Sequence, residues 1–194
     1  MSGKLFIVSA PSGAGKTSLV EEVLGRLKPK YLIDRLITYT SRDIRKGEKE
    51  GVDFCFVSSQ EFEMRIKNDF FLEWSKEYHH YYGSPASVLQ ELKAGNSRVL
   101  VIDQNGAKQV LQRVPEASTI WIYTPTIEVL RERLEKRGLN TPEQIKKRLE
   151  IAKNELAQEE KTRSYKHHIL NGVYKEAADN LENVLLGELL RNPS

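Results

Sequence analysis

The fold is most constrained by four short apolar runs that alternate with amphipathic stretches. The runs are LFIVS (5–9), RVLVI (98–102), STIWIY (118–123) and HHILN (167–171), and turn or capping residues bound each of them. After these runs, apolar residues recur at three- and four-residue spacings, which predicts helices over 18–27, 105–114, 127–137, 142–158 and 176–190. Alternation of strand and helix predicts an α/β fold in which a parallel sheet carries helices on both faces.

The segment from about 35 to 97 breaks this alternation. It is polar and punctuated by glycine, and TYTSRDIRKGEKEGVDFCFVSS within it alternates like a short antiparallel meander. A chain of 194 residues is long enough to bury one good core with small inserted lobes. We therefore expect one domain over 1–194, with this segment inserted into the α/β core.

Composition restricts the partners. Lys and Arg number 30 against 27 Asp and Glu, and a net charge of +3 is too small to indicate nucleic acid. A single cysteine, Cys55, cannot form an internal disulfide, and we read it as a small buried apolar residue. There is no apolar run of membrane-spanning length and no signal-peptide pattern at the start, so we expect a cytoplasmic protein without a membrane partner.

The turn APSGAGKTS (10–18) directly follows the first expected strand. The phosphate-loop pattern G-x-x-x-x-G-K-[ST] is met at Gly15, Lys16 and Thr17, whereas Ala10 stands at its first glycine. A tight turn that opens a helix directs several N–H groups and a partial positive charge at one point, which favours an anion. Ala10 adds only a methyl group and is tolerable where its φ is negative.

Within this turn the side chains suit a nucleoside triphosphate. Gly13 and Gly15 allow unusual dihedrals and close approach to phosphates, and Lys16 can reach the terminal phosphates. The Thr17 hydroxyl can bind a Mg²⁺ that bridges them. The alternative is a glycine-rich turn that binds nothing. The expected triphosphate contacts are Ala10, Pro11, Ser12, Gly13, Ala14, Gly15, Lys16, Thr17 and Ser18.

A second group of residues follows in the inserted segment. Arg42 and Arg45 are suited to holding a dianionic phosphate by paired charge-assisted bonds. Glu73 lies in FLEW among apolar neighbours, and its carboxylate can accept two hydrogen bonds from N1–H and the exocyclic amine of guanine. The alternatives are a solvated basic loop and an aromatic helix that packs on the core.

The chain resembles the guanylate kinases, which transfer a phosphoryl group from ATP to GMP or dGMP. The resemblance rests on APSGAGKT, TSRDIRKGE, FLEW, YYGS, IDQNGA, RLEKRG, KKRLEIAKNEL and ILN, in this order over nearly the whole chain. It implies a P-loop core (1–34 and 97–190), a GMP-binding lobe (about 35–96) and a small helical lid (about 134–150). The implied lobe coincides with the inserted segment. The implied lid contains a capping box that the sequence predicts at Thr141, Pro142 and Gln144.

The resemblance also implies roles for individual residues. Catalysis is assigned to Lys16 with the lid residues Arg137 and Arg148, and Asn171 is assigned to the ATP base. The alternative for the lid arginines is the solvated face of charged helices. The GMP-binding residues implied are Thr38, Arg42, Arg45, Glu73, Tyr82, Ser84 and Asp103. The implied cofactor is Mg²⁺ with ATP, the implied partners are ATP and GMP, and the oligomeric state is left open.

Two departures from the family pattern bear on these roles. Val101 replaces an acid that usually stands two residues before Asp103, and Phe54 replaces a tyrosine whose hydroxyl touches the GMP phosphate. We expect altered constants, including weaker GMP binding, and retained chemistry. Two other functions stay open: an inactive binding module of the same fold, and a related P-loop kinase for another phosphorylated acceptor.

Overall fold

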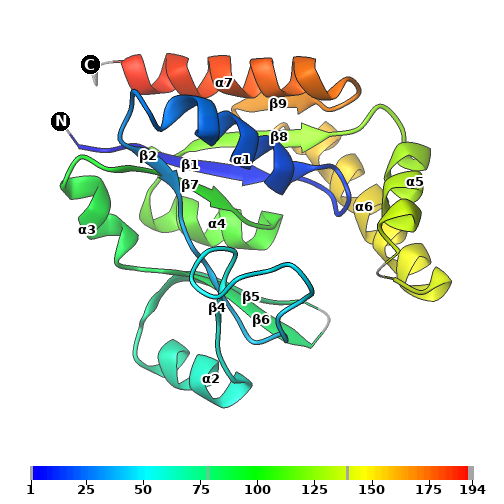
Figure 1. Ribbon diagram of the computed structural model, residues 1–194, viewed down its shortest axis with the longest axis horizontal. Helices are drawn as coiled ribbons and strands as arrows, with labels where there is room; N and C mark the ends of the chain where they lie inside the picture. Colours follow the sequence, from blue (N-terminus) through cyan, green and yellow to red (C-terminus); the bar gives the residue numbers. More distant parts are fainter. Residues whose placement is uncertain (1, 78, 139, 192–194) are drawn as a thin grey trace. The chain divides into compact units, whose positions relative to one another are not determined.

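The computed structural model describes residues 2–77, 79–138 and 140–191 (Figure 1). The chain divides into two compact units. Unit 1 comprises Met1–Leu5 and Leu32–Ala117, and unit 2 comprises Phe6–Tyr31 and Ser118–Ser194. The finer division into core, GMP-binding lobe and lid stays a prediction.

Unit 2 is built on parallel strands covered by helices. Strand β1 (Leu5–Ser9) pairs in parallel with β8 (Ser118–Tyr123), and β8 pairs in parallel with β9 (His167–Leu170). Every residue of β1 is buried, as expected for a strand covered on both faces. The helices of this unit are α1 (Lys16–Leu27), α5 (Ile127–Arg137), α6 (Pro142–Thr162) and α7 (Tyr174–Leu190).

Arg26 of α1 links this helix to α7 at their surface. Arg26 donates to Asp179 at 2.8 Å and to Glu182 at 2.9 Å, and it also pairs with Glu22 on its own helix. Leu181 and Leu185 of α7 are fully buried, so the apolar face of this helix supplies part of the core.

Unit 1 contains a parallel strand pair and a separate mixed sheet. Strand β2 (Ile33–Arg35) pairs in parallel with β7 (Ser97–Val101). The second sheet has the order β4-β3-β6-β5, with β3 (Tyr39–Thr40), β4 (Cys55–Phe56), β5 (Phe71–Glu77) and β6 (His80–Pro85). The helices of this unit are α2 (Ser59–Lys67), α3 (Val88–Lys93) and α4 (Gln104–Arg113).

The predicted elements of the α/β core are confirmed. The four predicted strands are β1, β7, β8 and β9, and their ends differ from the expected ones by one residue at most. Helix α1 begins two residues earlier than predicted, because Gly15 already acts as its N-cap. The predicted capping box of α6 is also present, with Thr141 and Gln144 each accepting from the other's backbone N–H.

One expectation for the inserted segment is wrong, and one of the alternatives is excluded. The stretch around Arg42 is not an antiparallel meander, because β3 and β4 pair in parallel and the antiparallel partner of β3 is β6. A long connection between β3 and β4 replaces the tight turn that a hairpin needs. The stretch FLEWSKE is a strand of a β-hairpin, which excludes the aromatic-helix alternative.

Two further observations concern Cys55 and the helices. Cys55 is half-buried on β4, so the expectation of a buried residue is wrong. Within the described ranges, no helix is both long enough and apolar enough to cross a membrane.

Candidate active site

The loop between β1 and α1 has the backbone of a phosphate-binding turn. Gly13 has φ 92° and Gly15 has φ 87°, both in the left-handed region that favours glycine. Ala10 is buried and is not among the described residues with positive φ. The methyl group at the first glycine position of the pattern is therefore accommodated, as predicted.

Space as well as conformation requires glycine in this loop. A Cβ on Gly15 would lie 2.7 Å from Nδ2 of Asn171, and one on Gly13 would lie 3.2 Å from Cγ of Leu134. The loop thus packs closely on α5 and on the residue that follows β9.

The start of α1 is arranged to attract an anion. Among the described residues no side chain caps its first turn, and that turn carries no acidic residue, so the partial positive charge of the helix end is not neutralised locally. Lys16 donates from Nζ to the carbonyl of Ala10 at 3.4 Å, which keeps the ammonium beside the loop. Thr17 is exposed on the same turn.

Two predicted residues from distant parts of the chain reach this loop. Arg148 of α6 donates from Nη1 to Oγ of Ser12 at 2.7 Å. Asn171, directly after β9, is 1% exposed and donates from Nδ2 to the carbonyl of Ala14 at 2.7 Å. The Oδ1 atom of Asn171 is buried and has no hydrogen-bond partner among the described residues.

One arginine near the loop was not predicted. Arg133 of α5 donates to the carbonyl of Ala14 at 3.3 Å and to that of Asn171 at 3.0 Å. Arg137, which was predicted, is exposed in the last turn of the same helix. The four-residue spacing places both on one helix face, and this was the signal available in the sequence.

In unit 1, the hairpin β5–β6 presents Glu73. The residue is 3% exposed, and its carboxylate accepts a hydrogen bond of 2.6 Å from Oγ of Ser84, which is opposite it in the hairpin. Burial raises the pKa of Glu73 to about 7, and the nearby charge of Asp103 adds to the rise, while the Ser84 bond opposes it.

The end of β7 and the start of α4 form the other wall of this carboxylate site. Asp103 caps α4 by accepting from the N–H of Gly106 at 2.8 Å, and its other oxygen accepts from Oγ of Ser75 at 2.7 Å. A Cβ on Gly106 would lie only 2.6 Å from Oε2 of Glu73. Gln109 of α4 bonds both backbone groups of Trp74, which fixes the strand that carries Glu73.

Arg42 is a buried cation in the connection between β3 and β4. Its side chain is 6% exposed, which excludes the solvated-loop alternative for this residue, whereas Arg45 is exposed. The guanidinium lies over the rings of Phe54 and Phe56, at 4.9 and 5.5 Å from their centroids. Tyr82 packs edge-on against Phe54, and Thr38 is buried in the same unit.

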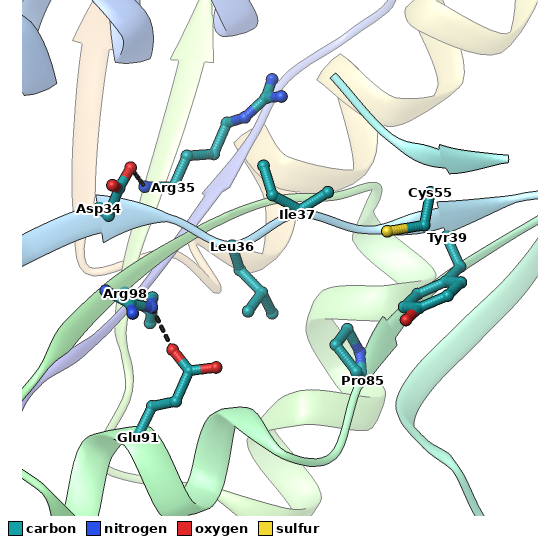
Figure 2. Close-up of a pocket in the computed structure, with 9 residues that line it drawn as sticks. All are labelled: Asp34, Arg35, Leu36, Ile37, Tyr39, Cys55, Pro85, Glu91 and Arg98. Carbon is teal, nitrogen blue, oxygen red and sulfur yellow. Dashed lines mark hydrogen bonds and ion pairs between the residues drawn. The ribbon is translucent and has the colours of Figure 1, made fainter. Parts of the chain in front are cut away.

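A separate cavity in unit 1 contains none of the predicted site residues. It has a volume of about 340 Å³, and Asp34, Arg35, Cys55, Glu91 and Arg98 are among its lining residues (Figure 2). Its polar groups are satisfied internally, since Arg98 pairs with Glu91 and Arg35 donates to the carbonyls of Val52 and Asp53. Burial raises the pKa of the Cys55 thiol, so this thiol is a poor nucleophile.

The loop after β1, which opens α1 with Gly-Lys-Thr in an α/β fold of largely parallel strands, defines a P-loop nucleotide-binding protein. A family model described as guanylate kinase matches residues 2–188. This chain therefore belongs to the guanylate kinase family.

Similar proteins agree with this membership. The guanylate kinase of Carboxydothermus hydrogenoformans is 40% identical, with 97% of this chain and 90% of that protein covered. The guanylate kinase of Hahella chejuensis is also 40% identical, over 97% of this chain and 88% of that protein. The crystal structure of guanylate kinase from Anaplasma phagocytophilum superposes with a TM-score of 0.80 at 29% identity, covering 98% of this chain and 88% of that one.

Proposed function

We propose that this chain is an ATP:GMP phosphotransferase, which converts ATP and GMP (or dGMP) to ADP and GDP (or dGDP). The observation that carries the proposal is a buried Glu73 carboxylate, bonded to Ser84, in a chain that also has a phosphate loop. Such a reaction belongs to purine nucleotide metabolism and GMP recycling, and we place it in the cytoplasm.

On the ATP side, the phosphates bind to the loop 10–18. Lys16 and the loop N–H groups stabilise the negative charge on the phosphates. Arg148, held at Ser12, and Arg137 stabilise the negative charge of the transferred phosphoryl group as its bond to ADP loosens. The Oδ1 atom of Asn171 is suited to accept from the amine of the adenine base, because it has no hydrogen-bond partner among the described residues.

Thr17 would hold the Mg²⁺ that accompanies ATP. Its exposed hydroxyl is a hard oxygen ligand, and Mg²⁺ usually takes only one or two protein ligands and keeps several waters, so the absence of an acid at Val101 is compatible with it. When bound, the ion neutralises phosphate charge. The residues of the chain align the triphosphate through the loop backbone.

On the GMP side, Glu73 and Ser84 read the guanine, with Asp103 beside them. Arg42, Arg45, Tyr82 and Thr38 bind the phosphate. Adenine would leave the buried carboxylate without its two donors, which disfavours AMP by a factor that can reach roughly 10⁴. Replacement of Glu73 by Gln is therefore expected to abolish most of the preference for GMP over AMP.

The test is ADP release from Mg-ATP with GMP, AMP, CMP or UMP offered separately, and with Lys16→Ala as the control. Rapid turnover with GMP alone, lost in the variant, supports the proposal. Binding of GMP without turnover of any monophosphate would indicate an inactive binding module. Turnover of another phosphorylated acceptor in place of GMP would indicate a different P-loop kinase.

A further inference from the structure

Glu48, which none of the roles above uses, makes four hydrogen bonds within the connection that carries Arg42 and Arg45. Its two carboxylate oxygens accept from Nη2 and Nη1 of Arg42 at 2.6 and 2.7 Å, the paired geometry of a bidentate ion pair. The oxygen that binds Nη1 also accepts from the backbone N–H of Arg45 at 2.9 Å. In return, the N–H of Glu48 donates to the carbonyl of Arg45 at 3.0 Å.

This pair is shielded from water. The side chain of Arg42 is 6% exposed and that of Glu48 is 18% exposed, so the attraction between them is less screened than that of a surface pair. The hydrogen bonds from Arg42 hold the pKa of Glu48 below its usual value, and the backbone N–H and charge of Arg45 act in the same direction. The carboxylate is therefore ionised at neutral pH.

The remaining contacts of Arg42 leave its guanidinium little freedom. The rings of Phe54 and Phe56 cover its planar surface, and Nη1 also donates to the carbonyl of Asp43 at 2.9 Å. Because residue 54 is phenylalanine, its ring packs against the guanidinium of Arg42 but offers it no hydrogen bond. A long flexible side chain is thus fixed in one rotamer by a carboxylate on one edge and by rings on its surface.

We propose that Glu48 is a positioning residue for the acceptor phosphate. It orients the guanidinium of Arg42 and the backbone at Arg45, which together form the phosphate clamp, before GMP arrives. The conformational entropy of ordering this clamp is therefore lost on folding and not on binding. This inference rests on the proposed function, since it assigns Glu48 a role in the same GMP-binding site.

The opposite role makes a distinct prediction. If the carboxylate instead occupied Arg42 as a competitor of the phosphate, its removal would strengthen GMP binding. The direction of the change in GMP affinity therefore separates positioning from competition.

The experiment compares Glu48→Gln with Glu50→Gln in the same connection. Glu50 is exposed, and its carboxylate accepts from the backbone N–H of Phe56, so Glu50→Gln is a matched control that removes one negative charge from the same connection. For Glu48→Gln we expect the KM for GMP to rise roughly tenfold to a hundredfold, because charge-assisted bonds that fix Arg42 are lost. The KM for ATP should be unchanged in both variants.

Inhibition by guanosine separates positioning from a merely structural role, because general damage to the site would also weaken guanosine binding. Guanosine lacks the phosphate, so its inhibition constant should stay within about twofold of the wild-type value in Glu48→Gln if only the phosphate clamp is affected. An unchanged or lower KM for GMP, or equal weakening of guanosine and GMP, would overturn the inference. A wild-type chain that does not phosphorylate GMP would instead refute the proposed function.

Discussion

Glu73 shows how one buried group links folding to ligand binding. The carboxylate is covered by the hairpin and by the start of α4, and burial raises its pKa to about 7. Guanine donates two N–H groups, so it binds the ionised form. Near neutral pH, the unliganded protein therefore holds this carboxylate in a mixture of protonated and ionised forms.

We predict that guanosine affinity rises between pH 6 and pH 8 and then levels off, because the fraction of ionised Glu73 rises through a pKa of about 7. Guanosine is the suitable probe, since it has no phosphate to titrate in this range. The measurement is its inhibition constant as a function of pH. In Glu73→Gln the same range should give a flat profile, and a persistent rise would assign the effect to another group.

The same pKa predicts a pH dependence of stability. The folded-state pKa lies above the ordinary value of 4.5, so the native state binds the proton more tightly than the unfolded chain. The contribution of Glu73 to the free energy of unfolding is thus complete below pH 4.5 and is lost as the pH rises through about 7. Thermal melts should show Glu73→Gln gaining stability relative to wild type from pH 5 to pH 8. A constant difference would contradict this assignment.

Gly106 is expected to be required for guanine selection. A methyl group there would meet Oε2 of Glu73 at 2.6 Å, so Gly106→Ala must displace the carboxylate or the start of α4. We expect the ratio of GMP to AMP turnover to fall by at least roughly tenfold. The control is Gly187→Ala in α7, where a Cβ meets no atom of the described residues within 4 Å and alanine should stabilise by about 0.5–1 kcal/mol. An unchanged ratio of GMP to AMP turnover in Gly106→Ala would show that the site accommodates the methyl group without losing selectivity.

At the level of elements, α6 brings one side chain to the phosphate loop. It spans Pro142–Thr162 and carries Arg148 to Ser12. Its start is fixed by Thr141 and Gln144, whose reciprocal bonds satisfy two backbone groups, and by proline in the first turn. The local sequence therefore determines where this helix begins.

Thr141→Ala should destabilise the first turn of α6 by about 1 kcal/mol, because the N–H of Gln144 loses its side-chain acceptor. The measurement is amide hydrogen exchange in that turn. Ser58→Ala, which removes the cap of α2, is the matched control and should increase exchange only in α2. Equal exchange in wild type and Thr141→Ala would show that packing alone holds the turn.

At the level of the whole molecule, the residues proposed for the two substrates lie in different units. The ATP-side residues Lys16, Arg148 and Asn171 belong to unit 2, whereas Arg42 and Glu73 belong to unit 1. Each ligand is therefore expected to stabilise mainly the unit that contains its binding residues.

We predict that GMP alone slows amide exchange mainly in 38–45, 73–84 and 103–106, and that an ATP analogue which cannot be hydrolysed slows it mainly in 10–18. At a ligand concentration of 100 Kd the stabilisation amounts to about 2.7 kcal/mol. The measurement is hydrogen exchange with each ligand separately and with both. Protection of 10–18 by GMP alone, equal to that given by the ATP analogue, would contradict this division of the sites.

The sequence by itself determined the elements whose signals are local. The order of apolar runs and amphipathic stretches predicted β1, β7, β8 and β9 and the helices between them. The turn before Lys16 and the capping box at Thr141 were also read correctly, because backbone sterics and nearest-neighbour hydrogen bonds act within a few residues.

Only the tertiary structure decided which distant groups meet. It paired β3 in parallel with β4, brought Arg133 to Ala14, placed Glu48 on Arg42 and put Gly106 against Glu73. Two-residue strands have too little periodicity to specify a partner, and a charged residue in a polar loop has many possible counter-ions. These contacts are selected by the path of the whole chain, because burial strengthens only the pairs that the fold brings together.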